Sequence, residues 1–321
     1  MIYIILLIAL AGIVFGADTL VNGSVAIARK YKVSDFVIGA AIVGVGTSMP
    51  ELTVSFLGAI QGNAEVAIGN VVGSNIFNIL GILGVTALFC PIVVTKSNLR
   101  FEIPVCIGVS VLLTLLVFNF FVNKGQTIGR FDGIVLLMGF ALFMWYSFYR
   151  DKKGLSAVVS EKQEETAREE DKPVWISIIK IIGGLAILIL SCDIFVDKAV
   201  VIARNFGLDD AFISITLIAC GTSLPELAAS IAAAARKNTQ LALGNILGSN
   251  IFNICLILGL SSMVTPLTST SITAVDYLVM IGAAMLPLVF GLRGRLGRVS
   301  GGIMFALFVA YTWYLLSIQI N

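Results

Sequence analysis

The sequence predicts an all-α polytopic membrane protein, with ten transmembrane helices arranged as two inverted five-helix repeats. The first observation is composition: the 321-residue chain is 58% hydrophobic and 12% charged, with a mean hydropathy of +1.00, which is outside the range of soluble domains. The second is that ten stretches are apolar over about 20 residues, the length that crosses the hydrocarbon core of a bilayer. The third is a set of polar motifs that recurs at a constant offset.

The predicted helices cover residues 2–28, 36–60, 65–89, 99–121, 130–149, 174–202, 211–235, 240–262, 272–292 and 298–319. Between the fifth and sixth helices lies a stretch of mixed charge with almost no apolar periodicity, which is typical of a solvated tether. A short cation-sensing or regulatory segment is the alternative for this stretch. We therefore divide the chain into a first repeat at 1–150, a linker at 151–172 and a second repeat at 173–321.

The basic residues predict the orientation. Ten spans place both termini on one side, and the loops of that side hold four basic residues, against sixteen in the opposite loops. The four are Lys124, Arg130, Lys198 and Arg204. Because cytoplasmic loops carry the excess of Lys and Arg, we expect a multi-pass protein of the cytoplasmic (inner) membrane, with both termini outside and the 151–172 loop in the cytoplasm.

The composition also excludes several classes of function. The net charge of +2 is too small to suggest a nucleic-acid partner. The chain has no histidine, which removes the commonest transition-metal ligand and the usual general base. The five cysteines are scattered singly, without a C-x-x-C pair, and no nucleophile and base pair is visible. We expect neither an enzyme nor a cofactor.

The repeat is visible in two motifs. Gly46–Glu51, GTSMPE, recurs 175 residues later as Gly221–Glu226, GTSLPE. A longer stretch, GNxxGSNIFN, is found at Gly69–Asn78 and again, at the same offset, at Gly244–Asn253. Because each half contains five spans, an odd number, the second half enters the membrane from the opposite side. Such inverted repeats are typical of secondary transporters, whose sites lie near the midplane where the repeats meet.

Each repeat places one carboxylate, Glu51 or Glu226, within an apolar helix. A charge at the bilayer centre costs at least about 2.5 kcal/mol, so we interpret both glutamates as functional. At about 100° per residue, Thr47 and Ser55 lie on the same face as Glu51, and the second half repeats this pattern. Pro50 and its counterpart Pro225 cannot donate a main-chain hydrogen bond, and each is expected to kink its helix.

Neutral oxygen ligands follow in the third and eighth spans, where Asn70, Ser74 and Asn78 recur at intervals of four residues. Amide, hydroxyl and carboxylate oxygens together suit Ca²⁺, Na⁺ or another hard cation. Helix packing is the alternative for the small and amide residues, and we favour it for the glycines of the longer motif. Asp18 and Asp193, on the first helix of each half, could equally support the site or lie near an interface.

These motifs resemble the paired repeats of the cation/Ca²⁺ exchanger superfamily, most closely its prokaryotic calcium/sodium antiporters, the sodium/calcium exchanger integral membrane protein family. The resemblance covers essentially the whole chain. It implies a Ca²⁺ site between Glu51 and Glu226, completed by the carbonyls of Thr47 and Thr222. It also implies flanking Na⁺ sites that draw on Ser48, Ser74, Ser223, Ser249 and the carbonyls of Gly44 and Ala219, with Asn78 and Asn253 around the centre. Helices 1 and 6 would slide past the rest in alternating access.

One feature departs from the family. Sodium/calcium members commonly carry an aspartate at one of the positions held here by Asn78 and Asn253. The charges of the two carboxylates, Glu51 and Glu226, balance one Ca²⁺ or two monovalent cations. We therefore predict a monomeric secondary antiporter that exchanges Ca²⁺ for Na⁺ and has no other partner than the lipid bilayer. An H⁺/Ca²⁺ antiporter that uses the same glutamates is the alternative, and a passive cation channel is the alternative of another class.

Overall fold

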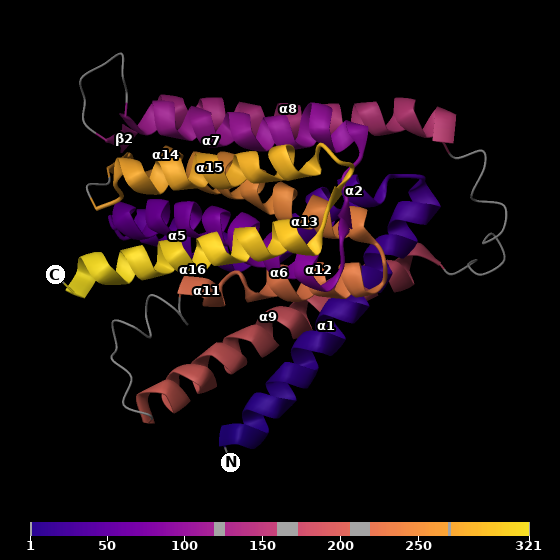
Figure 1. The fold of residues 1–321 in the computed structure, drawn as a ribbon, viewed down its shortest axis with the longest axis horizontal. Helices are drawn as coiled ribbons and strands as arrows, with labels where there is room; N and C mark the ends of the chain where they lie inside the picture. Colours follow the sequence, from indigo (N-terminus) through magenta and orange to yellow (C-terminus); the bar gives the residue numbers. More distant parts are fainter. Residues whose placement is uncertain (1, 119–125, 159–172, 206–218, 269–270, 321) are drawn as a thin grey trace.

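The computed structural model describes residues 2–118, 126–158, 173–205, 219–268 and 271–320. Its helices lie roughly side by side, and α1 and α9 are inclined against one side of the bundle (Figure 1). Short π-helical segments, labelled η, interrupt several of them. The first half contains α1 (Ile2–Tyr31), α2 (Asp35–Ile38), η1 (Gly39–Gly44), α3 (Val45–Thr47), α4 (Met49–Ile60), α5 (Ala64–Ile76), η2 (Phe77–Leu83), α6 (Gly84–Phe89), β1 (Ile92–Val93), η3 (Asn98–Glu102), α7 (Ile103–Phe118), β2 (Thr127–Ile128) and α8 (Arg130–Val158). The second half contains α9 (Val174–Asn205), α11 (Ala219–Gly221), α12 (Leu224–Ala235), α13 (Thr239–Phe252), η5 (Asn253–Ile257), α14 (Leu258–Val264), β3 (Leu267–Thr268), α15 (Ala274–Gly291), β4 (Arg295–Leu296) and α16 (Arg298–Ile320).

The predicted all-α membrane fold is confirmed. Within the described residues, eight helical stretches are long and apolar enough to cross a membrane, and the bent stretch from α2 to α4 supplies a ninth. The shorter apolar helix α12 is the copy of α4 and lies in the predicted seventh span. The beginning of that span (211–218), the end of the fourth (119–121), Lys124 and most of the linker (159–172) lie outside the described residues.

The second predicted span is broken. Its two parts, Asp35–Thr47 and Met49–Ile60, meet at an angle of 51°. The predicted kink is therefore present, but it lies at Ser48, two residues before Pro50. Pro50 itself occupies the first turn of α4, where a missing amide hydrogen costs nothing because that position has no intrahelical partner. The break places Glu51 in the first turn of a new helix.

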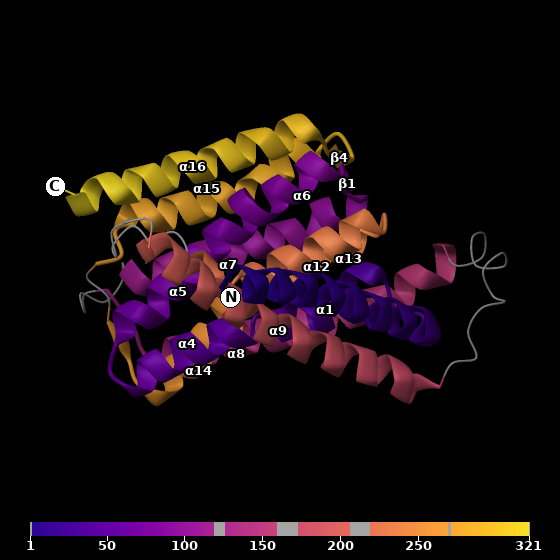
Figure 2. The same ribbon diagram turned by 90° about the horizontal axis from the view of Figure 1, so that it is seen from below.

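The pair α1 and α9 forms a layer of its own, on the face nearest the reader in Figure 2. Most of the packing of α1 is against α9. Their backbones approach closely at two glycines: a Cβ on Gly16 would lie 2.7 Å from the amide nitrogen of Leu188, and one on Gly184 would lie 2.6 Å from that of Leu20. The other helices pack around α5 and α13, and α13 is buried along its whole length except at Gln240.

Glycines also allow α13 to approach the segment formed by α2 and η1. A Cβ on Gly244 would overlap the carbonyl oxygen of Phe36, and one on Gly248 would overlap the backbone of Ala40. The predicted packing role of these two glycines fits this contact. The equivalent Gly73 on α5 has no described atom within 4 Å of its Cβ position, and the counterpart of Ala40, residue 215, lies outside the described residues.

Two short β ladders join the halves and were not predicted from the sequence. Ile92 of β1 is opposite Leu296 of β4, and Thr127 of β2 is opposite Thr268 of β3, both antiparallel. The ladders lie at opposite ends of the bundle, β2 at the left of Figure 1 and β1 with β4 at the right of Figure 2. Each ladder connects a loop of the first half with a loop of the second.

Candidate functional site

The two glutamates of the repeat lie at the start of equivalent helices, α4 and α12, and both are fully buried (0% exposed). Each accepts a hydrogen bond from the serine of the other half's motif. Ser48 Oγ donates to Glu226 Oε1 at 2.7 Å, and Ser223 Oγ donates to Glu51 Oε1 at 2.7 Å. The two motifs are therefore interlocked, and the N-terminal position of each glutamate in its helix favours a negative charge.

The remaining oxygens of these residues have no partner. The described part of the chain contains ten buried side-chain nitrogen or oxygen atoms without a hydrogen bond, and six belong to the predicted site residues. These six are Glu51 Oε2, Glu226 Oε2, Asn78 Oδ1, Asn253 Oδ1, Ser74 Oγ and Thr222 Oγ1. Because buried polar atoms are nearly always hydrogen-bonded, such a concentration of unpartnered oxygens indicates a site for a hard cation.

Four asparagines form a network that orients two of these oxygens. Asn78 Nδ2 donates to Asn250 Oδ1 at 2.9 Å, and Asn253 Nδ2 donates to Asn75 Oδ1 at 3.3 Å. Asn75 and Asn250 in turn donate to each other's main-chain carbonyls, at 3.2 and 3.1 Å. With their amide nitrogens engaged, Asn78 and Asn253 keep their oxygens free. Sequence reasoning did not assign a role to Asn75 or Asn250, although both lie within the repeated GSNIFN motif.

Other residues of the predicted polar stripes brace the helices instead. Asn70 Nδ2 donates to the main-chain carbonyl of Glu51 at 3.2 Å and to Ser55 Oγ at 2.9 Å. In the second half, Asn245 contacts Glu226 and Ser230 with the same distances. These contacts tie α5 to α4 and α13 to α12 just beyond each glutamate. The Asn70 and Asn245 amides hold the glutamate backbones and are not among the unpartnered groups.

The predicted flanking residues differ between the two halves. Ser249 Oγ donates to the carbonyl of Gly44 at 3.3 Å, so the structure brings these two predicted Na⁺-site residues together. Thr47 Oγ1 donates to the carbonyl of Val43 at 3.0 Å and lies 3.4 Å from that of Gly44. In contrast, the hydroxyl of Ser74, the copy of Ser249, is buried without a partner. Ala219, the copy of Gly44, begins α11.

Asp18 lies outside this centre. Its carboxylate pairs with Arg236 at the end of α12, with Nε at 2.8 Å, and Arg236 also contacts Asn22. The position equivalent to Arg236 in the first half holds Gln61, and Asp193, the copy of Asp18, is exposed. The ion pair therefore connects α1 to α12 without an equivalent between α9 and α4.

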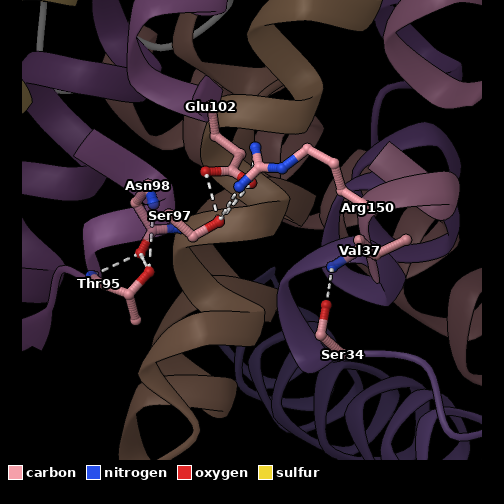
Figure 3. Close-up of polar contacts among 7 residues, drawn as sticks. All are labelled: Ser34, Val37, Thr95, Ser97, Asn98, Glu102 and Arg150. Carbon is pink, nitrogen blue, oxygen red and sulfur yellow. Dashed lines mark hydrogen bonds and ion pairs between the residues drawn. The ribbon is translucent and has the colours of Figure 1, made fainter. Parts of the chain in front are cut away.

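A second ionic cluster joins Arg150 of α8 to Glu102 of η3 (Figure 3). Arg150 is 3.6 Å from Glu102 and donates to Ser97 Oγ at 2.9 Å. Its guanidinium also stacks on the ring of Phe101, 4.6 Å from the ring centre. The cluster satisfies the charge of Glu102, so this buried carboxylate is a structural one.

Among the described residues there is no group of three or more His, Cys, Asp or Glu side chains that could hold a metal ion. The candidate site thus combines two carboxylates with neutral oxygens from both halves. A model of the sodium/calcium exchanger protein family matches residues 1–149 and 176–317. The chain belongs to this family. The family is one of transporters, and the protein is not an enzyme.

Similar proteins span nearly the full chain. It is 38% identical to a putative antiporter, CaxA, of Alkalimonas amylolytica, with 98% of each chain covered. It is 31% identical to the sodium/calcium exchanger MaX1 of Methanosarcina acetivorans, with 96% of this chain and 97% of that one covered. Among solved structures, the sodium-calcium exchanger NCX_Mj soaked with zero Na⁺ and Ca²⁺ has a TM-score of 0.81 and 31% identity, over 97% of both chains. The same exchanger soaked with 100 mM Na⁺ and 10 mM Sr²⁺ has a TM-score of 0.80 and 32% identity.

Proposed function

We propose that this exchanger is a secondary antiporter that moves Ca²⁺ against Na⁺ by alternating access, with Glu51 and Glu226 as the charged ligands of the cations. The observation that carries the proposal is that each glutamate is fully buried and keeps one carboxylate oxygen without a partner. Removing two carboxylates from water is costly unless a cation compensates them. Family membership supports Ca²⁺ and Na⁺ as the substrates.

Charge balance supports exchange. Two carboxylates with a combined charge of −2 neutralise one Ca²⁺ or two Na⁺, while Asn78 and Asn253 contribute oxygens without charge. The two carboxylates can therefore neutralise either load but not both at once. We assign Ca²⁺ to the centre between the glutamates, with the Thr47 and Thr222 carbonyls. We assign Na⁺ to flanking positions that use Ser48, Ser74, Ser223, Ser249 and the carbonyls of Gly44 and Ala219.

Movement is assigned to the pair α1 and α9. These helices pack mainly against each other, whereas the loops of the remaining bundle are joined across the halves by both β ladders. We propose that the pair slides across this frame, so that the site opens to one side at a time. The functional halves are residues 1–150 and 173–321, and the 151–172 linker lies in the cytoplasm with both termini outside.

The test is ⁴⁵Ca²⁺ uptake by the purified protein in Na⁺-loaded liposomes. Uptake should require the outward Na⁺ gradient, and Glu51→Gln should abolish it. Glu102→Gln is the matched control, because Glu102 is also a buried carboxylate but pairs with Arg150 outside the motifs. Uptake that survives Glu51→Gln would contradict the assignment of the site.

The same liposomes separate the alternatives. An H⁺/Ca²⁺ antiporter would take up Ca²⁺ in response to a pH gradient without Na⁺, since a carboxylate desolvated between helices can carry a proton. A passive channel would conduct Ca²⁺ without any counter-ion. Saturable uptake that depends strictly on Na⁺ rules out both.

A further inference from the structure

The bundle contains a second polar feature, far from the glutamates in sequence and independent of the proposed transport site. A cavity of about 720 Å³ lies where α15 ends, β4 follows and α16 begins. Its lining includes three arginines, Arg293, Arg295 and Arg298, and no acidic residue. Three like charges around one cavity attract anions.

Within the part of the chain that the structure describes, the arginines have no side-chain partner. Glu102 engages Arg150, and Asp18 engages Arg236, but none of the three cavity arginines forms an ion pair or side-chain hydrogen bond with the described residues. All three are exposed. Their guanidinium groups are therefore available, and the planar fork of a guanidinium matches the oxygens of a phosphate group.

Three other lining residues are branched aliphatic side chains with exposed surface. Val289 is 55% exposed, Val299 is 77% exposed and Ile303 is 43% exposed, and all three line the cavity. They belong to α15 and α16, two helices that are long and apolar enough to span a membrane. A ligand in this cavity would contact three guanidinium groups at one end and branched aliphatic side chains along its length. An anionic phospholipid has the matching parts, a negatively charged headgroup and apolar acyl chains.

The three arginines lie in the loop between α15 and α16 and at the start of α16, at the end of the bundle that carries most of the basic residues. We propose that this end is cytoplasmic. Basic pockets between transmembrane helices on that side are suited to anionic headgroups.

We propose that this cavity binds the phosphate headgroup of an anionic phospholipid, with the acyl chains lying along Val299 and Ile303. The lipid bridges α15 and α16 and neutralises the arginines. A free phosphate would engage the same guanidinium groups but would leave the apolar walls without a contact.

The experiment is lipid retention by the full-length protein from bilayer nanodiscs of phosphatidylcholine and phosphatidylglycerol, measured by native mass spectrometry. The test variant carries Arg293→Gln, Arg295→Gln and Arg298→Gln. The control variant carries Arg29→Gln, Lys30→Gln and Lys32→Gln, an equal loss of charge in the last turn of α1 and directly after it. The wild type and the control should retain phosphatidylglycerol in preference to phosphatidylcholine, and the test variant should lose this preference at least about tenfold.

Each other outcome overturns the proposal. Equal losses in both variants would show diffuse attraction of anionic lipid, and equal retention of both lipids would show an apolar groove only. Displacement of phosphatidylglycerol by millimolar inorganic phosphate would show a site for the free anion. Circular dichroism and Na⁺-dependent Ca²⁺ uptake check that the variants are folded. A folded test variant with unchanged lipid retention would contradict the proposal directly.

Discussion

Removing the side chain of Asn250 tests whether the asparagine network orients the candidate site. In Asn250→Ala, Asn78 Nδ2 loses its acceptor at 2.9 Å and the main-chain carbonyl of Asn75 loses its donor at 3.1 Å. A buried polar group left without a partner costs about 1–3 kcal/mol, so the two together destabilise the protein by about 2–6 kcal/mol before relaxation. The Asn78 amide can relieve half of this cost by reversing, which turns its nitrogen toward the cation.

The reversal replaces an oxygen ligand by an N–H donor. If the site loses about 1.4–2.8 kcal/mol of binding free energy, the Ca²⁺ dissociation constant rises about 10- to 100-fold. Isothermal titration calorimetry on the detergent-solubilised protein measures this directly, and thermal denaturation measures the stability.

Asn98→Ala is the control, because Asn98 is equally buried but its Oδ1 accepts from the amide and the hydroxyl of Thr95, at 2.8 and 2.7 Å, outside the site (Figure 3). This control should lose stability and keep its Ca²⁺ affinity. A folded Asn250→Ala protein that binds Ca²⁺ within twofold of the wild type would refute the reasoning.

Three further outcomes are expected. Ser223→Ala removes the 2.7 Å hydrogen bond to Glu51, and because a hydrogen bond to a charged group contributes about 1.5–3 kcal/mol, Ca²⁺ affinity should change by at least about tenfold; an unchanged affinity in calorimetry would place Ser223 outside the site. Arg236→Gln gives the second half the residue of the first and removes an exposed ion pair worth up to about 1 kcal/mol, so the ratio of the two exchange directions in oriented liposomes should shift by no more than about fivefold, with stability intact. Gly248→Ala forces a Cβ against the backbone of Ala40 in η1 and should lower the thermal midpoint by the equivalent of about 1–3 kcal/mol; an unchanged midpoint in thermal denaturation would contradict this packing contact.

Most of the fold could be predicted from the sequence, because its apolar stretches and its internal repeat are both strong signals. Apolar stretches of membrane length need no long-range information, and the offset of 175 residues predicted both the inverted repeat and that the two GTSxPE motifs meet, as their serine–glutamate hydrogen bonds show. Proline predicted a kink near the first glutamate, although the chain breaks at Ser48, because a proline is best accommodated just after a new helix begins.

Other features had no clear signal in the sequence. The β ladders are two residues long, too short for any alternation of polar and apolar residues. The spacing of Asn70, Ser74 and Asn78 predicts that they share one face of a helix. It does not predict which group each side chain contacts, so it could not distinguish a cation ligand from a residue that hydrogen-bonds to a neighbouring helix. The roles of Asn75 and Asn250 depend on contacts between the halves, which only the folded chain brings together.

The reciprocal hydrogen bonds between Asn75 and Asn250 follow a two-fold symmetry, as do those from Ser48 to Glu226 and from Ser223 to Glu51. In a symmetric dimer of one five-helix half, a single asparagine and a single serine would supply all of these contacts, because an isologous interface uses each residue twice. One repeat therefore encodes both sides of its own interface. A gene of half this length would already specify these contacts, and duplication with fusion would let the two copies diverge, as Arg236 and Gln61 have done.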